Sequence, residues 1–288
     1  MKMFPWFYGW NVVGLTLICQ VLTIGMPNFC FALLAMTWQQ EFAAPRRDVM
    51  LAMTLLLSAS GALSAFSGKW IDRLSARRLL CSGAAIFALG LICVAYARSM
   101  WQINLIFALL LPFGSVFAGP HLCQAVVGRW FDKGRGMALG ISVLGTSLGG
   151  FILPPIIVRA FDVLGWRHTF LAVAAFTLVM LIPLAYLILR RSPADLVIAA
   201  LEKPAAIAAT TAHSVLTSAQ VLTNVQFWSL VAGFTPVMLA FYAVHANLGA
   251  YAADIGFKPE QTAIMISVVS LSMMSGKIVF GWLIDRRC

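Results

Sequence analysis

The chain has 288 residues, of which 61% are hydrophobic and only 10% are charged. Soluble domains carry about 25% charged residues, so this composition excludes a protein that folds in water. Twenty Lys and Arg against ten Asp and Glu would suit nucleic-acid binding, but these charges form short clusters between long apolar runs instead of one solvated face. The composition therefore indicates an all-α membrane protein that does not bind nucleic acid.

Eight apolar runs are long enough to cross a bilayer, which takes roughly 20 residues. The first run begins close to the N-terminus and continues too far to be the core of a cleaved signal peptide. The fourth run is long enough to cross at a tilt. We expect transmembrane helices over residues 10–36, 49–67, 79–97, 101–128, 137–158, 168–189, 227–249 and 262–283.

The connecting segments differ in their content of Lys and Arg, which are more frequent in cytoplasmic loops. If the N-terminus is cytoplasmic, the inside segments hold 13 of these residues and the outside loops hold 6, while Lys277 lies within a helix. We therefore predict a multi-pass inner-membrane protein with a cytoplasmic N-terminus.

One connection is much longer than the others, and it begins where Arg190, Arg191 and Pro193 stop the sixth helix. We expect a cytoplasmic linker over residues 191–226, with short interfacial helices. It separates a six-helix bundle, residues 1–190, from the first two helices of a second bundle, residues 227–288.

A six-residue motif occurs twice, at the cytoplasmic ends of the second and eighth helices. The first copy spans residues 68–73 and the second spans residues 281–286, and Pro45 and Pro259 precede them at nearly the same distance. Internal repeats are typical of secondary transporters, in which the substrate site lies between the repeats near the membrane midplane.

The motif resembles the loop signature G-x-x-x-D-R-x-x-x-R-R of the major facilitator superfamily. In that family the loop latches two six-helix halves together on the cytoplasmic side, so the resemblance implies a gating role for these residues. The alternative is that the charges only set the topology. The matching positions are Gly68, Asp72, Arg73, Arg77, Arg78, Gly281, Asp285 and Arg286.

Four further stretches resemble the monocarboxylate and oxalate–formate porter branch of this superfamily. They are residues 6–10, residues 129–131, residues 135–140 and Gly165-Trp166-Arg167. The resemblance implies a major facilitator-type bundle of twelve helices and a small organic anion as substrate. Because the chain ends within the second copy of the latch loop, we expect it to be a fragment or a truncated product with eight of the twelve helices.

Lys277 is the one strongly basic residue within a predicted helix, and all ten acids fall in loops. A charge at membrane depth is costly and is therefore a functional candidate. Gly276-Lys277 followed by Gly281 resembles the branch's G-R-x-x-x-G, which implies that Lys277 faces the central cavity and holds a substrate carboxylate. Lys in place of Arg offers a point charge, which favours a small carboxylate. The alternative is that the long side chain extends to the cytoplasmic headgroups.

Proton coupling has weak support in the sequence. Proton symporters of the branch carry an Asp four residues before the basic residue, and here that position is Met273. His121 and His245 lie within predicted helices and titrate near neutral pH, although a membrane histidine also serves as a packing residue. The sequence therefore favours anion exchange slightly over symport.

Several uncharged polar side chains also lie within predicted helices, where they line a cavity or join neighbouring helices by hydrogen bonds. These substrate-site candidates are Gln20, Asn28, Gln124, Tyr242 and Asn247.

The leading hypothesis is alternating-access transport of a small mono- or dicarboxylate, by exchange with a counter-anion or by symport with a proton. Efflux of amphipathic drugs by the same fold is one alternative, and a non-transporting membrane sensor or scaffold is another. The sequence contains no Cys/His grouping with metal-ligand spacing, no Ser/His/Asp grouping and no phosphate-binding loop. We therefore expect neither an enzyme, a metal site nor a cofactor.

Overall fold

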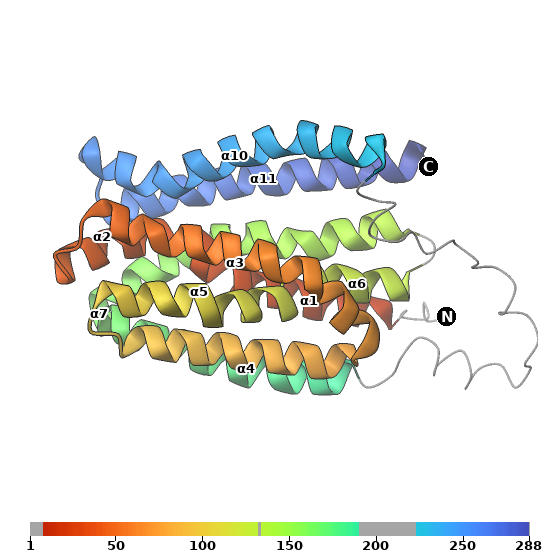
Figure 1. Ribbon diagram of the computed structural model, residues 1–288, viewed down its shortest axis with the longest axis horizontal. Coiled ribbons are helices and arrows are strands. Elements are labelled where there is room, and N and C mark those ends of the chain that lie inside the picture. Colours follow the sequence, from red (N-terminus) through yellow and green to blue (C-terminus); the bar gives the residue numbers. More distant parts are fainter. Residues whose placement is uncertain (1–7, 132–133, 190–222, 288) are drawn as a thin grey trace, which may run out of the picture.

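The computed structural model describes residues 8–131, 134–189 and 223–287. Within those ranges the chain is helical apart from short turns, and it contains no strand. Figure 1 shows the helices lying side by side along one common direction. This arrangement confirms the predicted all-α bundle.

The first predicted helix is interrupted near its middle. It consists of α1 (Gly9–Ile24), a π-helical turn η1 (Gly25–Phe29) and α2 (Phe31–Glu41). Pro27 lies in the π-helical turn, and a proline removes one helical hydrogen bond and disturbs the preceding turn. A π-helical turn accommodates the extra residue, and the Cys30 N–H donates to the Gly25 carbonyl at 3.3 Å.

The fourth predicted helix is also broken. The helices α3 (Arg46–Arg73) and α4 (Ala76–Ala95) precede it and correspond to the predicted second and third spans. Both begin a few residues earlier than predicted, and α3 also ends a few residues later. The fourth span comprises α5 (Met100–Phe117) and α6 (Pro120–Trp130). Gly119 is extended because the residue before a proline avoids the helical region, and Pro120 starts a new helix in the position that prolines favour.

The longest helical segment, α7 (Arg135–Ile188), contains two membrane crossings. Its 54 residues would extend about 81 Å as one straight helix, whereas a bilayer core is about 30 Å thick. Gly165 divides it with φ 75° and ψ 160°, a conformation that side chains with a Cβ rarely adopt. The chain turns back there (Figure 1), so the two arms correspond to the predicted fifth and sixth spans.

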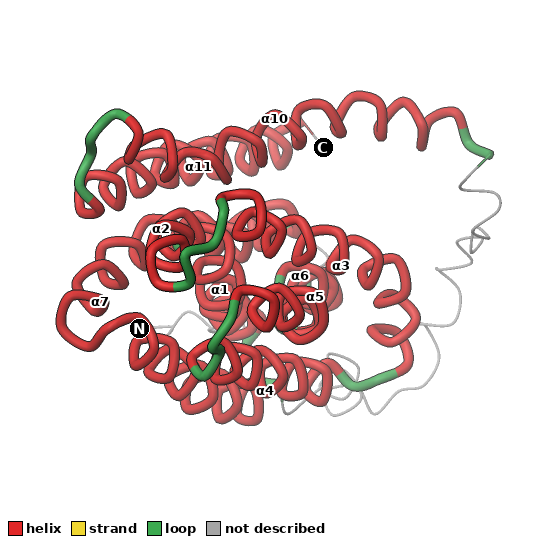
Figure 2. The backbone as a smooth tube through the Cα atoms, turned by 60° about the vertical axis from the view of Figure 1, so that its left-hand side comes forward, coloured by secondary structure: helices red, strands yellow, loops and turns green. Residues whose placement is uncertain are grey.

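The last two helices, α10 (Val225–Asp254) and α11 (Pro259–Arg287), lie together along one side of the bundle (Figures 1 and 2). Across the described ranges, seven helical segments are long and apolar enough to span a membrane. Since α7 crosses twice, the total agrees with the eight predicted spans. Residues 191–222 of the predicted linker lie outside the described residues, and its end, from Val225, already belongs to α10.

The bundle core lies between the first six spans. Its largest fully buried side chains are aromatic and cluster around Trp38. The Trp38 ring packs edge-to-face on Phe107 at 5.8 Å and on Trp166 at 6.3 Å between ring centroids. Because these residues come from α2, α5 and α7, the core fixes the relative positions of the helices against which α11 packs.

Candidate functional site

The N-terminal bundle and the last two helices meet where α11 runs antiparallel to the first arm of α7. At one end the Ser267 hydroxyl donates to the Phe151 carbonyl at 2.9 Å. One turn further along α11, Ser270 packs against Gly150, where a Cβ would lie only 2.3 Å from the Ser270 hydroxyl oxygen. Gly150 therefore permits the close approach of α11 and also of the Phe29 ring in η1, whose Cδ1 would lie 2.3 Å from the same Cβ.

Lys277 lies two turns further along the same contact and crosses it with its side chain. The ammonium group donates to the hydroxyls of Thr146 and Ser147, the latter at 2.8 Å, and to the Val143 carbonyl at 3.4 Å. An ammonium group has three N–H donors, so these three oxygens occupy all of them. The side chain thus points into the helix contact, not along α11 toward its end.

The surroundings of this ammonium group are polar but uncharged. Among the described residues, the ion pairs involve three carboxylates near the opposite ends of the helices, and none of them includes Lys277. Thr146 is 11 residues from the start of α7, about 16 Å along the helix, which places the group inside the apolar span. The positive charge is therefore held within the membrane-spanning region by neutral oxygens alone.

Gln20 lies on α1, which also packs against α7, and is fully buried. Its amide donates to the Ser142 carbonyl at 2.8 Å and to the Ser142 hydroxyl at 2.9 Å, and this hydroxyl also lies 2.8 Å from that of Thr16. The structure therefore uses Gln20 to join α1 to α7. Its partner Ser142 is next in sequence to Val143, an acceptor of Lys277, but Gln20 makes no hydrogen bond to Lys277 itself.

Asn28 belongs to η1, and His245 lies where α10 contacts this turn. Asn28 donates to the Ile24 carbonyl at 3.2 Å within its own helix. The His245 ring is only 7% exposed, packs edge-to-face on Phe29 with centroids 4.7 Å apart, and stacks on Phe241. Tyr242 on the same helix is 39% exposed. These contacts give His245 an aromatic packing environment.

Asn247 lies near the end of α10, far from Lys277. Its side-chain oxygen accepts a hydrogen bond from Arg46 at 3.0 Å, and Arg46 also pairs with Asp254 at 3.6 Å. His121 and Gln124 are exposed on α6. The structure therefore groups none of these three predicted site residues with Lys277.

The predicted gating loop is described only in part, because the side chains of Asp72, Asp285 and Arg286 and the surroundings of Gly281 lie outside the described residues. A Cβ at Gly68 would meet no described atom within 4 Å, so close helix approach does not explain that glycine in this structure. Arg73 is exposed at the end of α3.

The hydroxyls of Thr146 and Ser147 are the site residues that sequence reasoning missed. Ser and Thr are frequent in transmembrane helices and carry no distinctive pattern of their own. The signal that does set them apart is their position between Gly145, Gly149 and Gly150, because small residues mark a face where another helix comes close.

The Gly165-Trp166-Arg167 stretch forms the turn between the two arms of α7. Both the Trp166 ring nitrogen and the Arg167 guanidinium donate to the Glu41 carboxylate at the end of α2. Arg167 also donates to the Ala97 carbonyl at 3.0 Å, beyond the end of α4. This stretch therefore joins the ends of three spans.

A bundle of apolar helices long enough to cross the membrane repeatedly, with a half-buried cation between α11 and α7, defines a multi-pass membrane protein. The chain belongs to the Major Facilitator Superfamily, whose family profile matches residues 14–288.

Three relatives show the range of the similarity. Agnestins efflux protein AgnL12 of Paecilomyces divaricatus is 30% identical over 76% of this chain and 47% of its own length. Monocarboxylate transporter 12-B of Danio rerio is 25% identical over 98% of this chain and 62% of its own length. Monocarboxylate transporter 11 of Homo sapiens is 30% identical over 82% and 47%, respectively. The chain spans about half the length of the curated relatives it matches.

Proposed function

We propose that these helices belong to a secondary transporter that carries a small mono- or dicarboxylate by alternating access, with Lys277 as the group that binds the carboxylate. The observation that supports this proposal is the position of the Lys277 ammonium group between α11 and α7, on neutral oxygens alone. We also propose a cytoplasmic N-terminus in the inner membrane, as the distribution of basic residues favours.

An ion inside an apolar span is costly unless it is paired or hydrogen-bonded. The oxygens of Val143, Thr146 and Ser147 satisfy the N–H donors but leave the charge itself uncompensated. A carboxylate that entered between the two helices would supply the opposite charge in a medium of low dielectric constant, where attraction is strong. The site is thus suited to an organic anion.

This attraction also couples binding to movement. Lys277 belongs to the last two helices and its three acceptors belong to the N-terminal bundle, so a bound carboxylate would compete for donors that now join the two parts. Exchange of hydrogen bonds at their boundary is the kind of local change that a rocking movement of repeats requires. The names of two relatives, both monocarboxylate transporters, agree with an anionic substrate.

Lys277→Gln tests the proposal directly. In the transport-competent protein that contains these helices, we expect the variant to lose saturable uptake of radiolabelled small carboxylates into proteoliposomes, and Lys277→Arg to retain part of it. Lys258→Gln, the same change in the exposed turn before α11, should leave uptake unaltered. Normal uptake by Lys277→Gln would remove the site assignment.

A second candidate function rests on one relative, which is named as an efflux protein. If the substrate is an uncharged or cationic amphiphile, Lys277→Gln should leave its transport intact. Measurement of a lipophilic cation and of a carboxylate with the same pair of proteins therefore distinguishes the two functions.

A further inference from the structure

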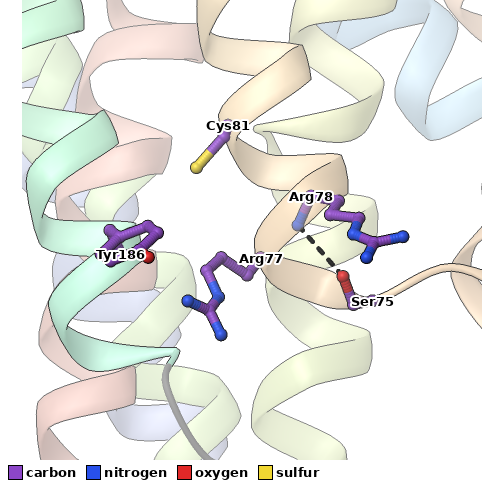
Figure 3. Close-up of a pocket in the computed structure, with 5 residues that line it drawn as sticks. All are labelled: Ser75, Arg77, Arg78, Cys81 and Tyr186. Carbon is purple, nitrogen blue, oxygen red and sulfur yellow. Dashed lines mark hydrogen bonds between the residues drawn. The ribbon is translucent and has the colours of Figure 1, made fainter.

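A cavity lies on the opposite side of the bundle from α10 and α11. It has a volume of about 650 Å³ and opens between the start of α4 and the end of α7. Figures 1 and 2 place α4 far from the last two helices, so this cavity is separate from the contact that Lys277 makes. Figure 3 shows its lining, which consists of Ser75, Arg77, Arg78, Cys81 and Tyr186.

The cavity is positively charged. Arg77 points toward Tyr186, with its guanidinium carbon 4.8 Å from the centre of the ring, while Arg78 extends to the other side of α4, the side of Ser75 (Figure 3). No ion pair between described side chains includes either arginine. The lining therefore presents two guanidinium groups, which match phosphate oxygens in geometry and charge.

The start of α4 adds backbone donors to this charge. The Ser75 hydroxyl accepts a hydrogen bond from the Arg78 N–H at 3.4 Å, and the first turn of the helix contains no acidic residue. The N–H groups at the start of a helix attract anions, and Ser75 at this helix start lines the same cavity as the arginines. The anion that best fits this combination is a phosphate group.

An apolar surface continues from the cavity along both helices. Leu89 lies three turns beyond Arg78 on the same face of α4 and is 50% exposed, and Val179 lies two turns before Tyr186 on α7 and is 72% exposed. A free phosphate ion would make no favourable contact with this apolar surface, whereas an acyl chain would pack against it. The feature as a whole has the amphipathic character of a membrane lipid.

We infer that this cavity binds an anionic phospholipid, with its phosphate beside Arg77 and Arg78 and an acyl chain along Leu89 and Val179. Basic pockets between transmembrane helices are suited to such headgroups. In the predicted topology the cavity lies at the cytoplasmic end. The segments at that end contain 13 basic and five acidic residues, whereas those at the other end contain six basic and five acidic residues. The inference does not depend on the identity of the transported substrate.

Lipid titration of the purified 288-residue chain tests this inference. Bound lipids are counted by native mass spectrometry during titration with phosphatidylglycerol or with phosphatidylcholine of the same acyl chains. We expect tighter binding of the first phosphatidylglycerol. We expect Arg77→Gln and Arg78→Gln each to weaken that binding by about fivefold, and the double variant by roughly 25-fold. Arg159→Gln, an exposed arginine at the other end of the bundle, is the matched control.

Two further measurements make the result decisive. Circular dichroism establishes that each variant is folded, and Arg77→Lys and Arg78→Lys, which keep the charge, should retain most of the preference for phosphatidylglycerol. Equal binding of the two lipids by the unmodified chain, or undiminished binding by the double Gln variant, would overturn the inference. Displacement of phosphatidylglycerol by millimolar inorganic phosphate would instead identify a site for free phosphate, and would also overturn it.

Discussion

Removal of the hydroxyls that hold Lys277 should destabilise the chain only as long as the lysine is present. Thr146→Val and Ser147→Ala preserve the approximate shape of α7 and delete two of the three acceptors of the ammonium group. In a Lys277→Met background there is no ammonium group to satisfy, so the same two substitutions should cost little. The difference between the two backgrounds is the coupling energy between Lys277 and the hydroxyls.

The magnitude follows from the two hydrogen bonds. Bonds to a charged group contribute about 1.5–3 kcal/mol each in soluble proteins, whereas interhelical bonds in membranes average about 0.6 kcal/mol. The Ser147 bond at 2.8 Å is well formed, and the Val143 carbonyl at 3.4 Å is too distant to replace both hydroxyls. We therefore expect a coupling energy of about 1–3 kcal/mol for the pair.

Reversible unfolding in mixed detergent micelles, followed by circular dichroism, measures the free energy of unfolding of four proteins. They are the chains with and without the two hydroxyls, each with Lys277 and with Lys277→Met. Thr177→Val is the control, because this hydroxyl donates to the Val173 carbonyl in the second arm of α7 and is remote from Lys277. It should destabilise equally with and without the lysine. A coupling energy within about 0.5 kcal/mol of zero for Thr146 and Ser147 would refute the geometry described above, since independent sites are additive to that extent.

Three further changes have defined outcomes. Gly150→Ala introduces a Cβ that lies 2.3 Å from the Ser270 hydroxyl oxygen and should lower the free energy of unfolding by about 1–3 kcal/mol, whereas Gly276→Ala, where a Cβ meets no described atom, should not. Arg167→Gln removes donors to Glu41 and should cost about 1 kcal/mol in the same assay, a value that grows smaller at high salt if the interaction is ionic. Arg46→Gln should increase trypsin cleavage after the exposed Lys258, because Arg46 joins α3 to α10 through two contacts; unchanged cleavage would mean that these contacts do not hold α10 in place.

The sequence was sufficient to predict the number of spans, because a bilayer imposes a minimum length on every apolar run. It predicted the interruptions poorly. The proline at position 27 and the Gly119-Pro120 pair are local signals that were present in the sequence, but hydrophobicity alone continues across both. Such signals indicate a break only when turn chemistry is weighed together with apolar length.

The neighbours of Lys277 could not be predicted in the same way. The rarity of a charge inside an apolar run singles out the lysine, but its acceptors come from residues 130 to 134 positions earlier in the chain. Which face of α7 meets α11 depends on tertiary packing, and the only local trace of it is the run of glycines around Thr146. The Gly165-Trp166-Arg167 stretch is similar, since its partner Glu41 lies 125 residues away from Trp166.

The break in the first span divides it into two arms with different attachments. The arm before Pro27 is bonded to α7 through Thr16 and Gln20, whereas the arm after it reaches α10, where Ala32 meets Gly249. Trp38 also anchors the second arm in the bundle core, so a displacement of the last two helices would act on this arm through its contact with α10. Bending would then be concentrated at the π-helical turn η1, which already contains one extra residue. The span can therefore act as a hinge while its contacts on either side are kept.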